Sequence, residues 1–148
     1  MTAPTPVLEL VCLSEVKPEP INWLWPGRIP KGKITLIAGH PGLGKSQVTV
    51  SIAAIVSSGG IWPVDEMPAD VGNVLILSAE DGIADTIKPR LLAAGADTNR
   101  IEAIEAVREG DQRFPFSLER DLELLRDTEA SLLIVDPLAA YMGGVDSH

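Results

Sequence analysis

One octapeptide, residues 39–46, constrains the fold of this chain more than any other feature. Its sequence, Gly-His-Pro-Gly-Leu-Gly-Lys-Ser, matches the pattern G-x-x-x-x-G-K-[S/T] at every position. The glycines let the backbone curl until successive amide N–H groups point inward, and such a nest at a helix N-terminus binds anions. The pattern therefore predicts a phosphate-binding loop between a buried strand and a helix.

The residues of this loop are expected to have separate tasks. The predicted nucleotide-binding residues are Gly39, His40, Pro41, Gly42, Leu43, Gly44, Lys45 and Ser46. Lys45 is expected to reach the β- and γ-phosphates as a mobile charge, and the Ser46 hydroxyl to ligate Mg²⁺. His40 occupies a variable position of the pattern and is assigned no chemistry. The alternative interpretation is a glycine-rich turn before a helix, with a solvated lysine.

Strand and helix patterns alternate along the chain, which predicts the α/β fold class. Apolar runs typical of buried strands occupy residues 33–38, 73–78 and 131–136, and residues 101–107 alternate apolar and acidic side chains like a strand near the sheet edge. Strands that alternate with helices of the length seen here form a parallel sheet with right-handed crossovers.

Helical spacing of apolar residues appears in three segments. The predicted helices are residues 45–57, stopped by Gly59-Gly60; residues 83–94, ended by Gly95, with a kink or late start at Pro89; and residues 118–127, with Ser117 as N-cap. Residues 1–31 are rich in proline and read as an extended lead-in, whose Trp23 and Trp25 pack onto a domain spanning residues 32–148.

Two acidic residues follow the ends of predicted strands. Asp136 comes directly after Leu132–Val135, and ligands of open α/β sheets lie outside such strand ends, so this carboxylate is expected to help hold Mg²⁺. Glu80 follows the strand ending at Ser78 and is a candidate base for the water that attacks the γ-phosphate, with Asp81 in a supporting or capping role. Turn capping by Asp136 and a solvated Glu80 remain the alternatives.

Charge and composition limit the classes of function. The net charge of −9 argues against a chain that coats nucleic acid or an anionic membrane nonspecifically. No apolar run is long enough to span a bilayer, and the N-terminus lacks the pattern of a secretory signal. A single cysteine, Cys12, excludes an intramolecular disulfide and fits a reducing compartment. We therefore expect a cytoplasmic protein without a membrane partner.

Three stretches together resemble RecA-like ATPase domains: Asn22–Gly39, Ser78-Ala-Glu-Asp-Gly82 and Leu132-Leu-Ile-Val-Asp-Pro137. Over roughly residues 20–148 the chain is similar to AAA-family ATPases related to RepA-type hexameric replicative helicases. The resemblance implies a three-layer parallel-sheet fold and ATP with Mg²⁺ as cofactors. It also makes Lys45 and Ser46 the Walker A pair, Glu80 the catalytic base and Asp136 the Walker B acid.

The resemblance also implies features that lie after the Walker B strand. RecA-like domains continue with a strand that carries a polar γ-phosphate sensor, and later with an arginine finger and usually a nucleic-acid-binding loop. The sequence stops at His148, so we expect a fragment truncated after the Walker B strand. Residues 139–148 resemble the start of a channel-facing loop; a frayed terminus is the alternative.

The function expected from these features is Mg²⁺-dependent ATP binding and hydrolysis by the core of a ring motor, with a homo-hexameric assembly and a DNA partner implied by the family. Two alternatives stay open at this point. One is a nucleotide-binding regulatory or assembly module without motor activity, and the other is a small-molecule P-loop kinase. For the kinase, neither an acceptor pocket nor lid arginines can be identified in the sequence.

Overall fold

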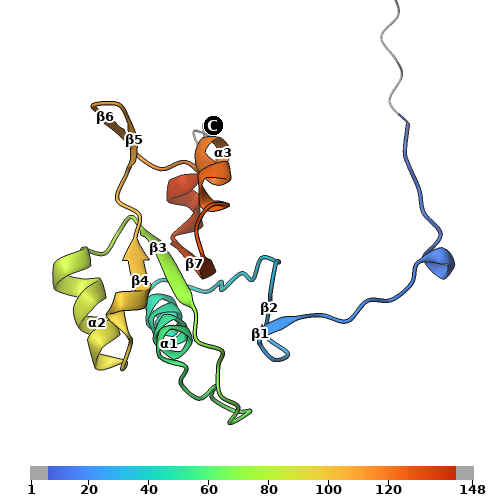
Figure 1. Cartoon of the computed structure of the whole chain (residues 1–148), viewed down its shortest axis with the longest axis horizontal. Coiled ribbons are helices and arrows are strands. Elements are labelled where there is room, and N and C mark those ends of the chain that lie inside the picture. The colour runs from blue at the N-terminus through green and yellow to red at the C-terminus, as the bar shows by residue number, and fades with distance from the viewer. Residues whose placement is uncertain (1–6, 143–148) are drawn as a thin grey trace, which may run out of the picture.

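A computed structural model describes residues 7–142 of the chain (Figure 1). The strands are β1 (Trp23–Trp25), β2 (Ile29–Pro30), β3 (Asn73–Ser78), β4 (Ile101–Ala103), β5 (Val107–Glu109), β6 (Gln112–Phe114) and β7 (Ala130–Asp136). The α-helices are α1 (Lys45–Ser58), α2 (Lys88–Ala93) and α3 (Leu118–Asp121). Short 3₁₀ turns are η1 (Leu13–Glu15), η3 (Thr98–Arg100), η4 (Leu122–Leu125) and η5 (Leu138–Tyr141), and η2 (Ile83–Ile87) is a π-helical turn.

The centre of the molecule is a parallel sheet with the strand order β4-β3-β7. Strands β3 and β7 run in register to their carboxyl ends, where Ser78 lies opposite Asp136. Both strands match the segments predicted from their apolar runs, and the mixed α/β class is confirmed. The common end of these two strands places the residues that follow them at one edge of the sheet (Figure 1).

Side chains alternate between the two faces of this sheet and join two separate apolar clusters. Val74 and Ile76 of β3 pack with α1 and α2 in the larger cluster, which also includes Ile134 of β7. Leu77 faces the other way and packs with Val107 and Phe116 in a smaller cluster beside Tyr141. Each face of the sheet is therefore covered, α1 and α2 on one side and the chain around α3 on the other.

Local sequence signals explain where the helices begin and end. Helix α1 stops at Gly59, which adopts a left-handed conformation with φ of 69° and donates its N–H to the carbonyl of Ile55. The second predicted helix has the late start expected from Pro89, because α2 begins only at Lys88 and the preceding turn is π-helical. It ends before Gly95, whose φ is 79°.

The prediction of a buried strand over residues 33–38 is wrong. This segment has no regular secondary structure, and Ile34 and Leu36 are 95% and 72% exposed. A β-strand needs a neighbouring strand to pair its N–H and C=O groups. In Figure 1 the segment runs alone between β2 and α1, and no strand among the described residues pairs with it.

Two other boundaries also differ from the sequence prediction. The strand expected over residues 101–107 is only the short edge strand β4, and Val107 instead begins a hairpin in which β5 pairs antiparallel with β6 around Gly110. The helix expected over residues 118–127 is one turn of α-helix followed by the 3₁₀ turn η4. Ser117 precedes it as predicted, but its hydroxyl makes no cap; its backbone N–H donates to Asp121 Oδ2 at 2.9 Å.

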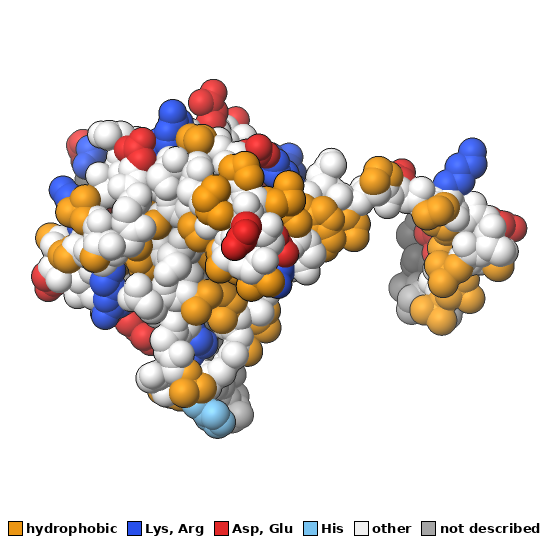
Figure 2. Space-filling model, turned by 90° about the horizontal axis from the view of Figure 1, so that it is seen from below, with side chains coloured by type: hydrophobic (Ala, Val, Ile, Leu, Met, Phe, Trp, Pro, Cys, Tyr) orange, Lys and Arg blue, Asp and Glu red, His pale blue; other side chains and the backbone are white. Residues whose placement is uncertain are grey.

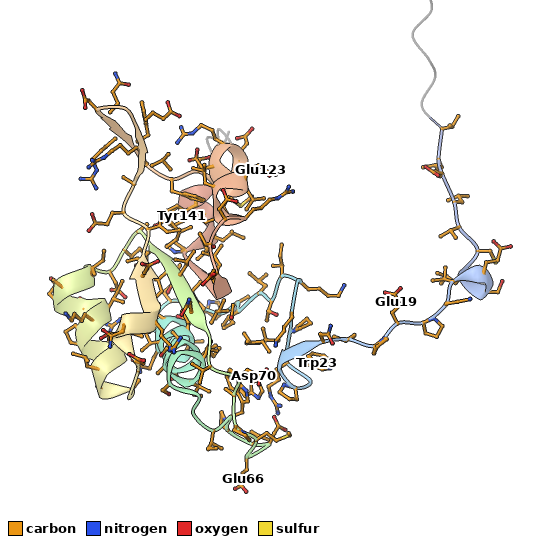
Figure 3. The ribbon with its side chains drawn as sticks, viewed as in Figure 1. Glu19, Trp23, Glu66, Asp70, Glu123 and Tyr141 are labelled. Atoms are coloured by element: carbon orange, nitrogen blue, oxygen red, sulfur yellow. The ribbon has the colours of Figure 1, made fainter. Side chains whose placement is uncertain are left out.

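The N-terminal region forms a small hairpin, β1–β2, that is fastened to the body. The indole of Trp25 stacks on that of Trp62 with ring centroids 4.8 Å apart. Lys31 also pairs with Asp70, which Figure 3 places on the loop beside the hairpin. Ahead of the hairpin, residues 7–21 project from the body as an arm with exposed apolar side chains (Figure 2). The division at residue 31 stays a prediction.

Candidate nucleotide site

The glycine-rich loop curls back on itself immediately before α1. Gly42 and Gly44 have φ values of 79° and 81°, a left-handed region that costs glycine nothing but strains other residues. The Lys45 ammonium donates to the carbonyls of Gly39 and His40 at 2.8 and 3.0 Å, so the lysine lies across the loop that precedes it. The octapeptide is therefore a closed loop, with its lysine beside the first residues of the motif.

The end of this loop carries backbone donors that the protein does not use. The first hydrogen bond of the helix runs from the Val48 N–H to the Gly44 carbonyl at 3.0 Å. Within residues 7–142, the N–H groups from Gly42 to Gln47 have no hydrogen-bond acceptor. Free amides at the start of a fourteen-residue helix, together with the positive end of its dipole, are suited to phosphate oxygens.

A small pocket lies between the start of α1 and the carboxyl ends of β3 and β7, and we call it the strand-end pocket. Its volume of about 20 Å³ suits a single ion or water molecule. Its polar lining comes from five residues: Ser46, Thr49, Ser78, Asp81 and Asp136. Its apolar lining comes from Val50, Ile76, Ile87 and Ile134. The structure thus brings Ser46 and Asp136 to one cavity, although they are far apart in the sequence.

The donor set of the strand-end pocket fits Mg²⁺ only in combination with a phosphate ligand. Among the described residues, no group of three or more His, Cys, Asp or Glu side chains is placed to hold a metal ion alone. Mg²⁺ usually keeps several waters and binds through one or two carboxylates plus substrate phosphates, so it needs no all-protein cage. The Ser46 hydroxyl and the Asp136 carboxylate can supply the protein's share of such a coordination sphere.

Glu80 and Asp81, on the loop after β3, lie differently with respect to the strand-end pocket. Glu80 is exposed and does not line the strand-end pocket. Asp81 does line it, and its Oδ2 accepts a hydrogen bond from Arg90 at 2.8 Å. The sequence pattern indicated only a supporting or capping role for Asp81 and assigned no role to Ser78 or Arg90. The shared strand end of Ser78 and Asp136 was the signal available for Ser78.

A larger hollow, about 360 Å³ in volume, lies between α1 and α2. It is lined by Gln47, Ser51, Ile55, Arg90, Ala93 and Ala94. None of the loop residues from Gly39 to Ser46 lines it, and Gln47 is the only residue with a free amide that does. The candidate site is therefore built on the loop and the strand-end pocket.

A parallel α/β sheet, with a glycine-rich phosphate loop opening its first long helix, defines the class of P-loop nucleotide-binding proteins. A family model described as AAA domain matches residues 4–148, and the chain belongs to this family. Membership indicates a nucleotide-binding ATPase, a class that usually employs Mg²⁺. Searches of curated proteins and of solved structures returned no match. Within residues 7–142, no helix has both the length and the apolar character that crossing a bilayer requires.

Proposed function

We propose that the chain binds ATP with Mg²⁺ at the loop of residues 39–46 and that this nucleotide is hydrolysed at the strand-end pocket. The observation that carries the proposal is the set of free amides between Gly42 and Gln47 at the start of α1. These donors lie beside Ser46, which shares the strand-end pocket with Asp136. A polyphosphate at the amides and a cation at the carboxylate suit each other in charge and position.

In this proposal the side chains of the loop and of the two strand ends have separate tasks. Lys45 transfers its hydrogen bonds from the carbonyls of Gly39 and His40 to the β- and γ-phosphates, because the oxygens of an anion are stronger acceptors. Ser46 and Asp136 hold Mg²⁺, which neutralises charge on the phosphates when it is bound. Glu80, on the loop that follows β3, takes the proton of the attacking water.

The finer proposal is a RecA-like core of a ring motor that acts on DNA, related to RepA-type hexameric helicases. Its support is the resemblance carried by Asn22–Gly39, by Glu80 one strand after the loop, and by Leu132–Pro137. The homo-hexamer and the DNA partner rest on this resemblance alone, which is an associational argument. Stimulation of ATP turnover by DNA would support the motor and argue against a regulatory module.

Replacement of Lys45 by alanine tests nucleotide binding directly. We expect Lys45→Ala to weaken the binding of a fluorescent ATP analogue by about 10- to 100-fold, the effect of losing hydrogen bonds to charged groups. Titration in Mg²⁺ buffer measures the dissociation constant, and circular dichroism checks the fold. Lys17→Ala is the matched control, because Lys17 lies on the exposed arm far along the chain from the loop.

Two results would contradict the proposal. One is an unchanged dissociation constant for folded Lys45→Ala, and the other is an equal loss of affinity in Lys17→Ala. Release of inorganic phosphate to water without any added acceptor would separately exclude the kinase alternative.

A further inference from the structure

The ion pair between Asp81 and Arg90 connects the strand-end pocket to helix α2. Arg90 Nη1 lies 2.8 Å from Asp81 Oδ2, and the two side chains are 42% and 32% exposed. Asp81 is also part of the lining of the pocket that contains Ser46 and Asp136. The pair therefore joins a residue of the pocket lining, Asp81, to a residue of helix α2, Arg90.

The backbone explains how Arg90 returns to Asp81, nine residues earlier. The chain leaves β3 and forms the wide turn η2, in which the Ile87 N–H donates to the Gly82 carbonyl at 2.9 Å. Pro89 accounts for the wide turn, since its ring clashes with the carbonyl four residues before it and it has no N–H to donate. Helix α2 then starts late, and Arg90 in its first turn reaches back to Asp81.

The other end of this loop is tied to the sheet. The Ala79 N–H donates to the carbonyl of Asp136 at 3.1 Å. The Asp81 N–H donates to the hydroxyl of Ser78 at 3.3 Å. The strand side of the loop is thus held through β7 and β3, whereas the Asp81 carboxylate itself is held by Arg90 alone among the described residues.

Only one oxygen of the Asp81 carboxylate accepts a hydrogen bond from a described residue. Oδ2 accepts from Arg90, and Oδ1 has no hydrogen-bond partner within residues 7–142. Asp81 and Asp136 also place two carboxylates on the lining of one small pocket. Like charges so placed repel each other, and a guanidinium on one of them offsets that repulsion.

We propose that Arg90 is a positioning residue that holds Asp81 on the lining of the strand-end pocket, where Asp81 Oδ1 orients a water of the Mg²⁺ shell. The inference rests on the proposed function, because it concerns the metal side of the same nucleotide site. Arg90 acts through Asp81, and Asp81 acts through water, as outer-shell groups of metal sites do. Ser46 and Asp136 would hold the ion itself.

The test compares nucleotide affinity with and without the metal. A fluorescent ATP analogue is titrated into the chain in Mg²⁺ buffer and in EDTA, and the ratio of the two dissociation constants measures the enhancement by Mg²⁺. We expect Asp81→Asn and Arg90→Gln each to lower this enhancement by about tenfold, the lower end for lost outer-shell groups, with affinity in EDTA unchanged. Arg90→Lys keeps the charge but not the planar fork, so it should restore part of the enhancement.

Two further variants make the test specific. Arg113→Gln is the matched control, because Arg113 pairs with Glu105 at 3.3 Å on the β5–β6 hairpin, and both side chains are more than half exposed. The double variant Asp81→Asn/Arg90→Gln should lose no more of the enhancement than Asp81→Asn alone, since the two residues act as one unit. A purely structural ion pair would change thermal stability and leave the ratio as it is.

The outcomes separate this inference from the proposed function. A wild-type chain that binds no nucleotide in either buffer overturns both. A wild-type chain with a clear Mg²⁺ enhancement that Asp81→Asn and Arg90→Gln retain overturns the positioning role alone. Equal losses in Arg113→Gln, or additive losses in the double variant, also overturn it.

Discussion

At the scale of single residues, the side chains of the candidate site differ in how firmly the protein holds them. Lys45 donates to two carbonyls of its own loop, and Asp81 is ion-paired with Arg90. Glu80 lies between Ala79 and Asp81, is exposed, and makes no hydrogen bond with any described residue. Glu80 is thus the candidate side chain with the fewest contacts, and its proposed role depends on where nucleotide and water lie.

Replacement of Glu80 by glutamine tests that role. Glu80→Gln preserves the shape of the side chain but removes its ability to accept a proton, so we expect ATP binding to persist and hydrolysis to fall by about 100-fold or more. Phosphate release and analogue binding are measured on the same preparation. Hydrolysis at the wild-type rate would assign the proton transfer to another residue, and Glu102→Gln on β4 is the matched control.

A second residue-scale prediction concerns the buried Asp121, far along the chain from the loop. Its side chain is 5% exposed, and the hydrogen bonds from Arg120, followed by that from the Ser117 N–H, lower the pKa of its carboxyl. Because the folded-state pKa lies below the unfolded value, the stabilisation is present at neutral pH. It disappears as the pH falls below about 3.9, the ordinary Asp value, and through the folded-state pKa.

We therefore expect Asp121→Asn to melt at a lower temperature than the wild type at pH 7, with a smaller difference near pH 3. Thermal unfolding followed by circular dichroism at both pH values measures this, and effects of other carboxylates cancel between the two proteins. Asp111→Asn, at the exposed turn of the β5–β6 hairpin, should match the wild type throughout. A difference in melting temperature that is independent of pH would contradict the prediction.

At the scale of elements, α1 is the part that links the loop to the core. Its first turn carries the free amides and Ser46, and its buried residues Ala53 and Val56 pack in the larger cluster against β3. Its end is set by Gly59, where an added Cβ would lie 2.7 Å from Val71 Cγ2. The position of the site therefore depends on how tightly the far end of α1 packs.

Two glycines with similar backbone conformations allow the cost of backbone strain to be measured separately from the cost of a steric clash. Gly59 and Gly95 both have positive φ, but a Cβ at Gly95 would meet nothing within 4 Å. We expect Gly95→Ala to lower the free energy of unfolding by about 1 kcal/mol through backbone strain. Gly59→Ala should cost about 1–3 kcal/mol more, because the methyl group also clashes with Val71.

Urea denaturation of the two variants measures the difference. Introducing Val71→Ala into the Gly59→Ala variant should recover part of the loss by making room for the methyl group. Equal effects of the two glycine substitutions would show that the crowding at Val71 is relieved without cost.

At the scale of the whole molecule, the β1–β2 hairpin is joined to the body by Leu24, which is buried in the larger cluster, and by an aromatic stack. Trp62 is 1% exposed, and the ring plane of Trp25 is inclined by only 7° to it. Asp65 accepts from Trp25 Nε1 at 3.1 Å and from Arg28 at 2.9 Å. These contacts join the lead-in to the loop between α1 and β3, which Figure 3 shows reaching its tip near Glu66.

Removal of the Trp25 ring should weaken the packing of the hairpin on the body without unfolding the sheet. We expect Trp25→Ala to accelerate amide hydrogen exchange in residues 21–31 and 61–69, with β3 and β7 unchanged, because local opening follows the loss of local contacts. Trp23→Ala is the control, since Trp23 is 37% exposed and does not take part in the stack. Acceleration in β3 as well would show that the hairpin and the sheet unfold as one unit.

Much of the architecture was predictable from local patterns. Strands β3 and β7 and helix α1 appear where apolar periodicity and Gly59 placed them, and the late start of α2 followed from Pro89. Residues 33–38 have the same apolar character as β3 but pair with no strand in the part of the chain that the structure describes, so the strand prediction was wrong. Residues 139–142 lie mostly in η5, and the remainder of the segment compared with a channel loop lies outside the described residues.

The sequence alone determined the features that depend on a few consecutive residues: a glycine-rich loop able to curl, a helix directly after it, and strands with apolar faces. Only the tertiary structure decided which strands find partners, which acid lines the strand-end pocket, and that Arg90 holds Asp81. The reason is physical. Backbone conformation is set by local sterics, whereas strand pairing, pocket lining and ion pairs require contacts between residues that only folding brings together.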